Sequence, residues 1–367
     1  MIIELLHTAR DKGASDLHLR AGQPPFLRVH GSILPLSEHP ALTPEDLGQA
    51  LAEITTDAQR SLFGSEGELE FAYTLPEAGR YRANVSLQRG TVAFVFRVLP
   101  TVIPTLEELG IPPVCQSLAG RHRGLVIVTG PTGSGKSTTL AAMLNYLNET
   151  VSRHVVTIED PIEYVHHSRR CLVSQRELGA DTRSFATALK HVLRQDPNVI
   201  LVGEMRDTET AAAALTAAET GHLVLTTGHA PSAPGTIDRI LSLFPPHQEA
   251  TERARLAMVL EGVLSQTLVP RGDGKGRVAA VEVMLATPAV RNLIRDGKTY
   301  QLPNVIRSGT NQGMQTMDQA LLDLYRRDLI SGEEALARCS NREEIEKQVF
   351  PLGRRAADQE AAGLAPK

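Results

Sequence analysis

The chain has 367 residues and a formal net charge of −4. This length has room for two domains, and the slightly acidic charge gives no support to a nucleic-acid partner. Cys115, Cys171 and Cys339 lie far apart, which excludes a paired-cysteine zinc site and a disulfide framework and suits a reducing cytoplasm. No apolar run reaches the roughly 18 residues of a membrane span. The N-terminus lacks a basic leader and carries Glu4 in its apolar stretch, so we expect no signal peptide.

The N-terminal part of the sequence predicts a small α/β domain with an antiparallel sheet. An apolar helix is expected to end at Gly13, and Thr43, Pro44 and Asp46 form the start signal of a second helix. Alternation of polar and apolar residues, with turn residues between, predicts strands over 16–20, 26–29, 32–34, 69–74, 81–87 and 91–98.

A proline-rich stretch divides the chain. Residues 99–113 carry several prolines around a short apolar piece, and we interpret them as an interdomain linker. The predicted domains therefore cover residues 1–98 and 114–350. Residues 351–367 are rich in alanine, glycine and charge, which predicts a flexible tail.

The second domain opens with a phosphate-binding signature. Residues 130–137 fit the pattern G-x-x-x-x-G-K-[ST]. A β-branched run precedes the loop and apolar residues at helical spacing follow it, so a bound phosphate would lie at a helix N-terminus. Lys136 adds a charge for the β- and γ-phosphates, and the Ser137 hydroxyl can hold Mg²⁺. The predicted nucleotide-binding residues of this loop are Gly130, Pro131, Thr132, Gly133, Ser134, Gly135, Lys136, Ser137 and Thr138.

An acidic cluster follows the next predicted strand. Residues 155–158 are a β-branched run, and Glu159, Asp160 and Glu163 come directly after it. Ligands bind at the carboxyl ends of strands in open parallel sheets. Three acids this close together repel one another unless a cation such as Mg²⁺ lies nearby. A solvated acidic turn is the alternative.

A further acid ends another predicted strand. Glu204 follows the run 199–202, where a carboxylate beside the γ-phosphate can orient or deprotonate the attacking water. This favours hydrolysis over transfer to another acceptor. Arg206 and Asp207 are expected to form a local pair.

Two histidines bracket the predicted strand 223–227. His229 follows its C-terminal tip, where it can hydrogen-bond the γ-phosphate. His222 precedes the strand and is expected to be structural or to face a neighbouring subunit. No cysteine or third histidine stands beside them, so we reject a metal site formed by the two histidines.

Arginines cluster near the end of the N-terminal domain. Arg80, Arg82, Arg89 and Arg97 fall on or beside its last two predicted strands. The presence of each arginine is explained if it lies on a solvent-exposed face of the sheet. The alternative hypothesis is that some of them reach a nucleotide on this subunit or a neighbour, because phosphoryl transfer often takes an arginine in trans.

The C-terminal part of the second domain is predicted to be mostly helical. Periodicity predicts helices over 236–243, 247–264, 288–296, 316–327 and 332–339, and a strand over 278–284. In the helix that begins at Pro288, Val290, Leu293 and Ile294 share a face that is expected to be buried. Arg291 and Arg295 stand together on the opposite flank. Simple solvation explains this pair, and the alternative is contact with an acidic partner surface or a neighbouring subunit.

Four motifs in order resemble those of the secretion ATPase superfamily. The phosphate loop, residues 157–164 (TIEDPIEY), residues 203–207 (GEMRD) and residues 216–229 are similar to its Walker A, Asp box, Walker B and His box. Residues 289–296 (AVRNLIRD) and 313–318 (GMQTMD) resemble the PilT branch, the retraction motors of type IV pili that drive twitching motility.

The resemblance implies a homohexamer of RecA-like P-loop ATPase domains, each with a smaller PAS-like α/β N-terminal domain. It implies that the ring hydrolyses ATP with Mg²⁺ to retract pili, at the cytoplasmic face of the inner membrane and bound to the pilus platform protein. The site residues that we predict beyond the phosphate loop fall into three groups. They are Glu204, Lys136, Glu163, His229, Arg82 and Arg97 for catalysis, Glu159, Asp160 and His222 for the nucleotide, and Ser137, Glu159, Glu163 and Glu204 for the metal.

One departure from the family, one absence and two rival classes bear on this interpretation. Residues 226–230 (TTGHA) differ from the family's usual Gly-Thr-Leu-His-Thr. The paired-cysteine zinc motif and longer N-terminal region of assembly-type relatives are absent, which favours retraction over pilus assembly or type II secretion. A RecA-like nucleic-acid motor would need a basic stripe that the sequence lacks. A ring subunit that binds ATP without hydrolysis is opposed by intact Lys136, Ser137 and Glu204.

Overall fold

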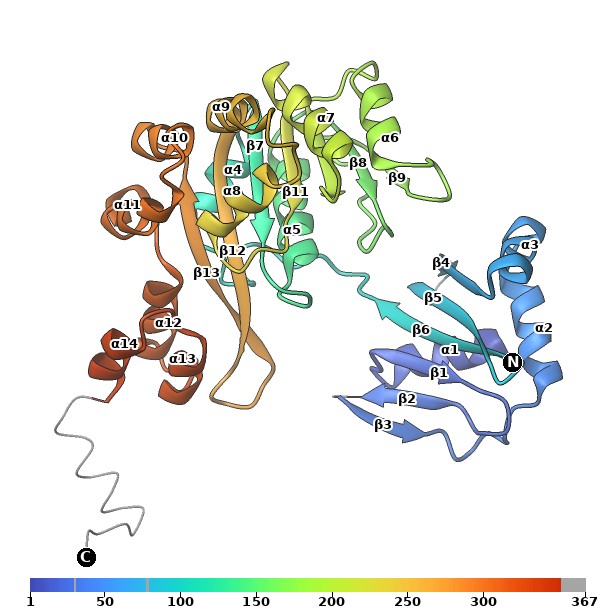
Figure 1. The fold of residues 1–367 in the computed structure, drawn as a ribbon. Helices are drawn as coiled ribbons and strands as arrows, with labels where there is room; N and C mark the ends of the chain where they lie inside the picture. Colours follow the sequence, from blue (N-terminus) through green and yellow to red (C-terminus); the bar gives the residue numbers. More distant parts are fainter. Residues whose placement is uncertain (30, 77–78, 351–367) are drawn as a thin grey trace, which may run out of the picture. The chain divides into compact units, whose positions relative to one another are not determined.

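The computed structural model describes residues 1–29, 31–76 and 79–350 as two compact units. The first unit is Met1–Ile103 with Pro161–Val165, and the second is Pro104–Asp160 with the chain from His166 onward (Figure 1). The flexible tail that we predict over 351–367 lies outside the described residues.

The first unit contains an antiparallel sheet, as the sequence predicts. Within the described residues the strand order is β3-β2-β1-β6-β5-β4. The elements are α1 (Ile2–Asp11), β1 (Asp16–Leu19), β2 (Phe26–Val29), β3 (Ser32–Pro35), α2 (Pro44–Ile54), α3 (Asp57–Glu66), β4 (Glu68–Leu75), β5 (Gly79–Gln88) and β6 (Thr91–Leu99). Thr43 and Asp46 form the expected capping box of α2. Helix α3 was not predicted, although Thr56 and Gln59 form the same kind of box at its start.

The second unit is built on a mostly parallel sheet with the order β13-β12-β7-β11-β10-β8-β9 in the described chain. Its strands are β7 (Gly124–Thr129), β8 (His154–Glu159), β9 (Leu172–Glu177), β10 (Val199–Glu204), β11 (Leu223–Thr227), β12 (Leu260–Pro270) and β13 (Arg277–Leu285). Strand β13 is antiparallel to β12, and the other neighbouring pairs are parallel. Parallel strands with both faces covered are apolar on both faces. Strand β7 shows this, because all its residues are buried.

Helices cover both faces of this sheet. One face packs against α4 (Val114–Ala119) and α5 (Lys136–Thr150) through Val126 and Val128. The other face packs, through Leu125 and Ile127, against a larger set of helices. These are α6 (Phe185–Val192), α7 (Thr208–Glu219), α8 (Ala233–Leu241), α9 (Glu249–Val259), α10 (Pro288–Arg295) and α11 (Leu302–Ser308).

Three further helices form a separate cluster, red in Figure 1. They are α12 (Met317–Arg326), α13 (Gly332–Arg338) and α14 (Arg342–Val349), with short 3₁₀ turns at Thr299–Gln301 and Thr310–Gln312 before them. Val269 of β12 and Ala280 of β13 belong to their apolar core. This cluster is therefore attached to the antiparallel end of the sheet.

The helix predicted over 247–264 is wrong in its second half. Helix α9 ends at Val259, and β12 begins at Leu260 and pairs with β7. An apolar run that is buried on both faces has no period that separates a strand from a buried helix. Gly262 lies where β12 comes close to α4, because a side chain there would meet Leu118 of α4 at 2.9 Å.

The prediction that Arg291 and Arg295 stand together on the outer flank of α10 is also wrong for Arg291. Its guanidinium donates to the carbonyls of Ala286, Ala257 and Met258 and to the Glu261 carboxylate, at 2.6 to 3.0 Å. Arg295 is exposed and donates to Asn292 on its own helix. Arg291 therefore fixes α10 to the end of α9, and only Arg295 of the pair faces solvent.

We expect Arg291→Ala to lower the free energy of unfolding by about 2 kcal/mol, because it leaves several half-buried carbonyls without their charged donor. Arg295→Ala is the matched control and should change stability by less than about 0.5 kcal/mol. Urea denaturation followed by circular dichroism measures both. Equal stabilities for the two variants would contradict the structural role of Arg291.

Candidate nucleotide-binding site

The candidate site lies where four neighbouring parallel strands of the second unit end, which we call the carboxyl edge. In the order of the sheet these strands are β7, β11, β10 and β8. The phosphate loop follows β7, His229 follows β11, Glu204 ends β10 and Glu159 ends β8. The sheet thus brings these predicted site residues to one edge, which is where open α/β sheets bind ligands.

The phosphate loop has backbone angles that glycine adopts readily. Gly130, Gly133 and Gly135 have φ of 140°, 79° and 88°. A side chain at Gly130 would meet the carbonyl oxygen of Gln266 at 2.2 Å, whereas one at Gly133 would meet nothing within 4 Å. Gly135 is the N-cap of α5 and provides no side-chain cap, so the first N–H groups of that helix face the loop. An anion is the natural partner of such a helix end.

Side chains in and beside the loop add charge and hydroxyls. Lys136 Nζ donates to the carbonyls of Gly130 and Pro131 at 2.9 and 3.0 Å, which holds the ammonium over the loop. Ser134 Oγ is buried and has no hydrogen-bond partner among the described residues, so a phosphate oxygen would satisfy it. Ser137 is exposed at the start of α5. These groups suit a nucleotide phosphate with a bound cation.

Glu204 is 9% exposed, and each of its two carboxylate oxygens faces a basic side chain. Arg206 Nη2 is 2.5 Å from one of its oxygens, and His229 Nε2 is 3.2 Å from the other. The local pair expected between Arg206 and Asp207 is therefore wrong. Asp207 instead caps α7, where its carboxylate accepts from the amide of Thr210 at 2.8 Å.

The acids after β8 fall in both units of the structure. Glu159 accepts from Thr157 Oγ1 at 2.6 Å and from Gln175 Nε2 at 3.0 Å, so it is fixed at the tip of its strand. Asp160 is the last residue before the segment Pro161–Val165, which belongs to the first unit. Glu163 lies in that segment, and Arg80 donates to the carbonyl of Ile162 there at 3.0 Å.

The two arginines predicted for a neighbour's site are paired within the first unit. Arg82 forms an ion pair with Glu70, and Arg97 Nε lies 3.0 Å from Asp16 Oδ1. Both are on adjacent strands, at directly opposite positions of β5 and β6. Both arginines are therefore already paired with a carboxylate of their own unit.

His222 lies away from the carboxyl edge. It precedes β11, and its carbonyl accepts from the amide of Gly124 at the start of β7. Its ring Nδ1 is 2.9 Å from the carbonyl of Ala217. The structure therefore separates His222 from the phosphate loop of its own chain, and the prediction that it binds this nucleotide is wrong within one subunit.

The sequence reasoning missed two residues that brace the loop. Gln266 of β12 accepts from Thr139 Oγ1 of α5 at 2.8 Å, and Thr129 Oγ1 donates to the carbonyl of Ala230 at 2.9 Å. A side chain at Gly228 would meet Thr129 Oγ1 at 2.9 Å, so the glycine of the unusual stretch 226–230 makes room for this contact. A polar residue at the end of an otherwise apolar strand was the available signal for Thr129, whereas Gln266 lies in a polar run, residues 265–267, of its strand.

Comparison with known proteins places this site in a family. The model of the family "Type II/IV secretion system protein" matches residues 95–326, which is more than half of the chain. The "Type IV pilus retractation ATPase PilT" of Pseudomonas aeruginosa is 49% identical over 334 residues, covering 91% of this chain and 96% of the relative. The chain is a secretion ATPase of the PilT type.

Two further relatives agree. The "Twitching motility protein" of Neisseria gonorrhoeae is 47% identical over 345 residues, covering 94% of this chain and 92% of that protein. The crystal structure of "the Pilus Retraction Motor PilT and Bound ADP" has a TM-score of 0.88 at 46% identity, covering 94% and 99% of the two chains. The predicted family, the RecA-like fold and the activity of this secretion ATPase as an ATP hydrolase are confirmed.

The part of the chain that the structure describes, residues 1–29, 31–76 and 79–350, has two further properties. None of the helices in this part of the chain combines the length and apolar composition of a membrane span. None of its groups of three or more His, Cys, Asp or Glu side chains is arranged to hold a metal ion.

Proposed function

We propose that this secretion ATPase is the motor that retracts type IV pili. The observation that carries the proposal is 49% identity over nearly the whole length of both chains with a pilus retractation ATPase. The arrangement at the carboxyl edge supports it, since Lys136, Glu204 and His229 are gathered there from adjacent strands. The proposed organisation is a PAS-like domain over 1–98, a linker over 99–113 and a RecA-like ATPase domain over 114–350.

The geometry of the carboxyl edge supports a proposed role for each residue. The N–H groups of the phosphate loop and Lys136 bind the β- and γ-phosphates. Glu204 orients the attacking water and accepts its proton, and His229, 3.2 Å from this carboxylate, senses the γ-phosphate. Arg206 is paired with Glu204 and neutralises its charge until substrate and water are in place.

The donors near the loop fit Mg²⁺. The exposed Ser137 hydroxyl and the carboxylates of Glu159 and Glu204 are the oxygen ligands that this ion prefers. When bound with the nucleotide, Mg²⁺ neutralises the charge that develops on the phosphates. Asp160 and Glu163 continue the same acidic run, and we propose that they contribute in the assembled protein.

We propose a homohexameric ring in which each site is completed by a neighbour. Arg82 and Arg97 are the candidates, and both already hold a carboxylate in their own domain. Exchange of that carboxylate for a phosphate keeps the arginine paired, so the guanidinium stays charge-compensated in both arrangements.

Mixed assemblies test this composite site. We expect Lys136→Ala and Arg97→Ala each to be inactive alone, and an equal mixture to recover about a quarter of the parental ATPase rate, because random mixing places two intact halves together at that frequency. Steady-state ATP hydrolysis measures the recovery. The control is a mixture of Glu107→Ala with Lys136→Ala. Glu107→Ala keeps both halves of the proposed site, so this mixture gives the activity of intact sites that need no complementation. A mixture of the two inactive variants with no activity would contradict a shared site.

The place of action follows from the proposed function. The ring is proposed to act at the cytoplasmic face of the inner membrane, bound to the pilus platform protein. A deletion strain tests the function as a whole. Retraction predicts cells that carry many pili and do not twitch, whereas an ATPase for pilus assembly predicts cells without pili. Normal piliation with loss of protein export would instead indicate type II secretion.

A further inference from the structure

A buried carboxylate outside the nucleotide site joins two helix starts. Glu282 lies in the middle of β13 and is 8% exposed. One carboxylate oxygen accepts from the amide of Ala233 at 2.6 Å, and the other accepts from the amide of Met317 at 3.4 Å. These amides are the first of α8 and of α12. Burial raises the pKa of the Glu282 carboxyl, with a further rise from nearby Asp318.

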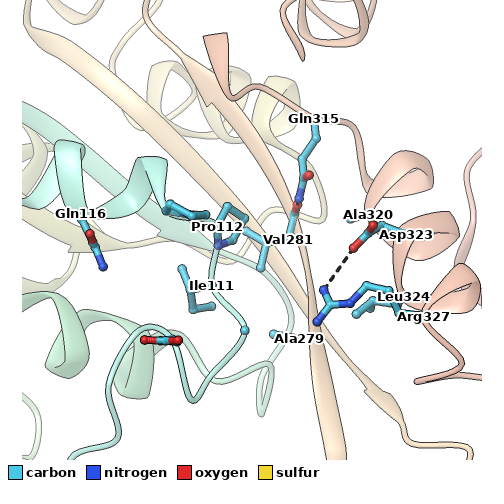
Figure 2. A pocket seen from close by; sticks show the side chains of 13 residues that line it. Ile111, Pro112, Gln116, Ala279, Val281, Gln315, Ala320, Asp323, Leu324 and Arg327 are labelled. Carbon is cyan, nitrogen blue, oxygen red and sulfur yellow. Dashed lines mark hydrogen bonds and ion pairs between the residues drawn. The ribbon is translucent and has the colours of Figure 1, made fainter. Parts of the chain in front are cut away.

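Helix α12 is held against β13 beside this carboxylate. The amide of Val283 donates to the carbonyl of Gln315 at 2.8 Å, and the Gln315 side chain donates to the carbonyl of Val281 at 2.6 Å. Figure 2 shows Gln315 reaching toward Val281 at the rim of a cavity of about 460 Å³ that α12 also lines. The backbone of Gln315 thus fixes the start of α12 over Glu282.

The other end of the contact is the segment that carries His229. Residues 229–233 cross above the strands β7, β12 and β13, and each strand contributes one buried side chain to them. Thr129 Oγ1 donates to the carbonyl of Ala230 at 2.9 Å, and Ser265 Oγ donates to the carbonyl of Pro231 at 3.0 Å. Glu282 accepts from Ala233. Three neighbouring strands of the sheet therefore fix the backbone that follows His229.

We propose that Glu282 is a positioning residue for ATP hydrolysis. It holds the segment 229–233 so that His229 stays beside Glu204, and it ties that segment to α12. The inference rests on the proposed role of His229 at the γ-phosphate. The carboxylate of Glu282 accepts from the amides of Ala233 and Met317, so its effect reaches the reaction through the backbone of this segment.

The choice of a carboxylate has a physical reason. Both helix starts present N–H donors, and a carboxylate can accept on both oxygens. The amide of glutamine has the same shape but can accept on one oxygen only, so its NH₂ group would face an N–H donor. Glu282→Gln therefore removes one of the two contacts while keeping the side-chain volume.

Asp318 supplies a matched control. It is 7% exposed and accepts from the amides of Ser340 and Asn341 at 2.7 and 2.8 Å. It is thus a second buried carboxylate that holds two backbone amides, but those amides belong to the turn between α13 and α14. Asp318→Asn should lower stability without moving the segment that carries His229.

We expect Glu282→Gln to lower kcat for ATP hydrolysis by about tenfold, with the KM for ATP within about twofold, because a charge-assisted hydrogen bond is lost away from the phosphates. Hydrogen exchange of a peptide spanning 229–235 should become faster. Asp318→Asn should keep the parental kcat and the parental exchange of this peptide. If Glu282→Gln folds poorly, Ser265→Ala tests the same segment, with an expected loss in kcat of about threefold for one neutral hydrogen bond.

Several results would overturn the inference. An unchanged kcat and unchanged exchange in Glu282→Gln would do so, and equal losses of kcat in Glu282→Gln and Asp318→Asn would show a general effect of destabilisation. An unchanged kcat in Ser265→Ala would count against it as well. A failure of the proposed function looks different, because the unmodified protein would then complement no twitching defect, while the exchange of peptide 229–235 would still report on Glu282.

Discussion

Glu204→Gln is expected to keep ADP affinity and to lower the rate of ATP hydrolysis by about 10²- to 10⁴-fold, the usual contribution of a general base. The carboxylate lies 9% exposed at the end of β10, with His229 Nε2 at 3.2 Å. The amide of glutamine has nearly the same shape, so the fold and the phosphate loop should be preserved. What is lost is the group that accepts a proton from water. Steady-state ATPase assays and titration with a fluorescent ADP analogue measure the two effects.

Glu209→Gln is the control for this experiment. Glu209 is an exposed acid in the first turn of α7, close in sequence to Glu204 but outside the proposed machinery. It should hydrolyse ATP at the parental rate. Turnover in Glu204→Gln equal to that of the control would remove the assigned role of Glu204 while leaving nucleotide binding untouched.

Gly130→Ala is expected to weaken ADP binding by about 100-fold. Gly130 has φ of 140°, and a Cβ there would lie 2.2 Å from the carbonyl oxygen of Gln266, a backbone atom that cannot rotate away. Backbone strain of about 3 kcal/mol is typical of a side chain forced into such a conformation. If the loop relaxes by leaving the binding conformation, this strain appears as a loss of about 100-fold in affinity.

Gly133→Ala separates the clash from the backbone angle. It also has positive φ, at 79°, but a side chain there meets no atom within 4 Å. It should lose about tenfold in affinity, from the cost of a left-handed residue alone. Titration with ADP measures the affinity of both variants, and Gly130→Ala should bind ADP more weakly than Gly133→Ala. Equal losses at the two positions would show that the contact with Gln266 is unimportant.

The sequence predicted the strands that carry the site because each is a short apolar run with a functional residue at its end. Strands β7, β8, β10 and β11 all follow this pattern, and the parallel sheet then brings their ends together. Strand β12 did not stand out, because its apolar run has no period that separates it from the helix before it.

Side-chain partners were harder to predict than elements. Arg206 has an acid next to it in sequence, yet it pairs with Glu204 while Asp207 caps a helix. A helix cap forms between residues that are close in sequence, so it can be predicted. The direction of an arginine side chain depends instead on the path of the backbone after the strand. Arg291 shows the same limit, because the carbonyls it binds belong to the end of another helix. Such contacts follow from tertiary packing and leave no local pattern.

The segment that follows His229 is anchored at short intervals. Its anchors lie on β7, β12 and β13, which are neighbouring strands about 4.8 Å apart, so the backbone crosses roughly 10 Å. The chain bends at Pro231 and Ser232 on the way, and Ser232 has φ of −146° and ψ of 162°. Each strand holds a different residue of the segment, so the insertion or deletion of one residue between Ala230 and Ala233 would move the anchors out of register with their strands.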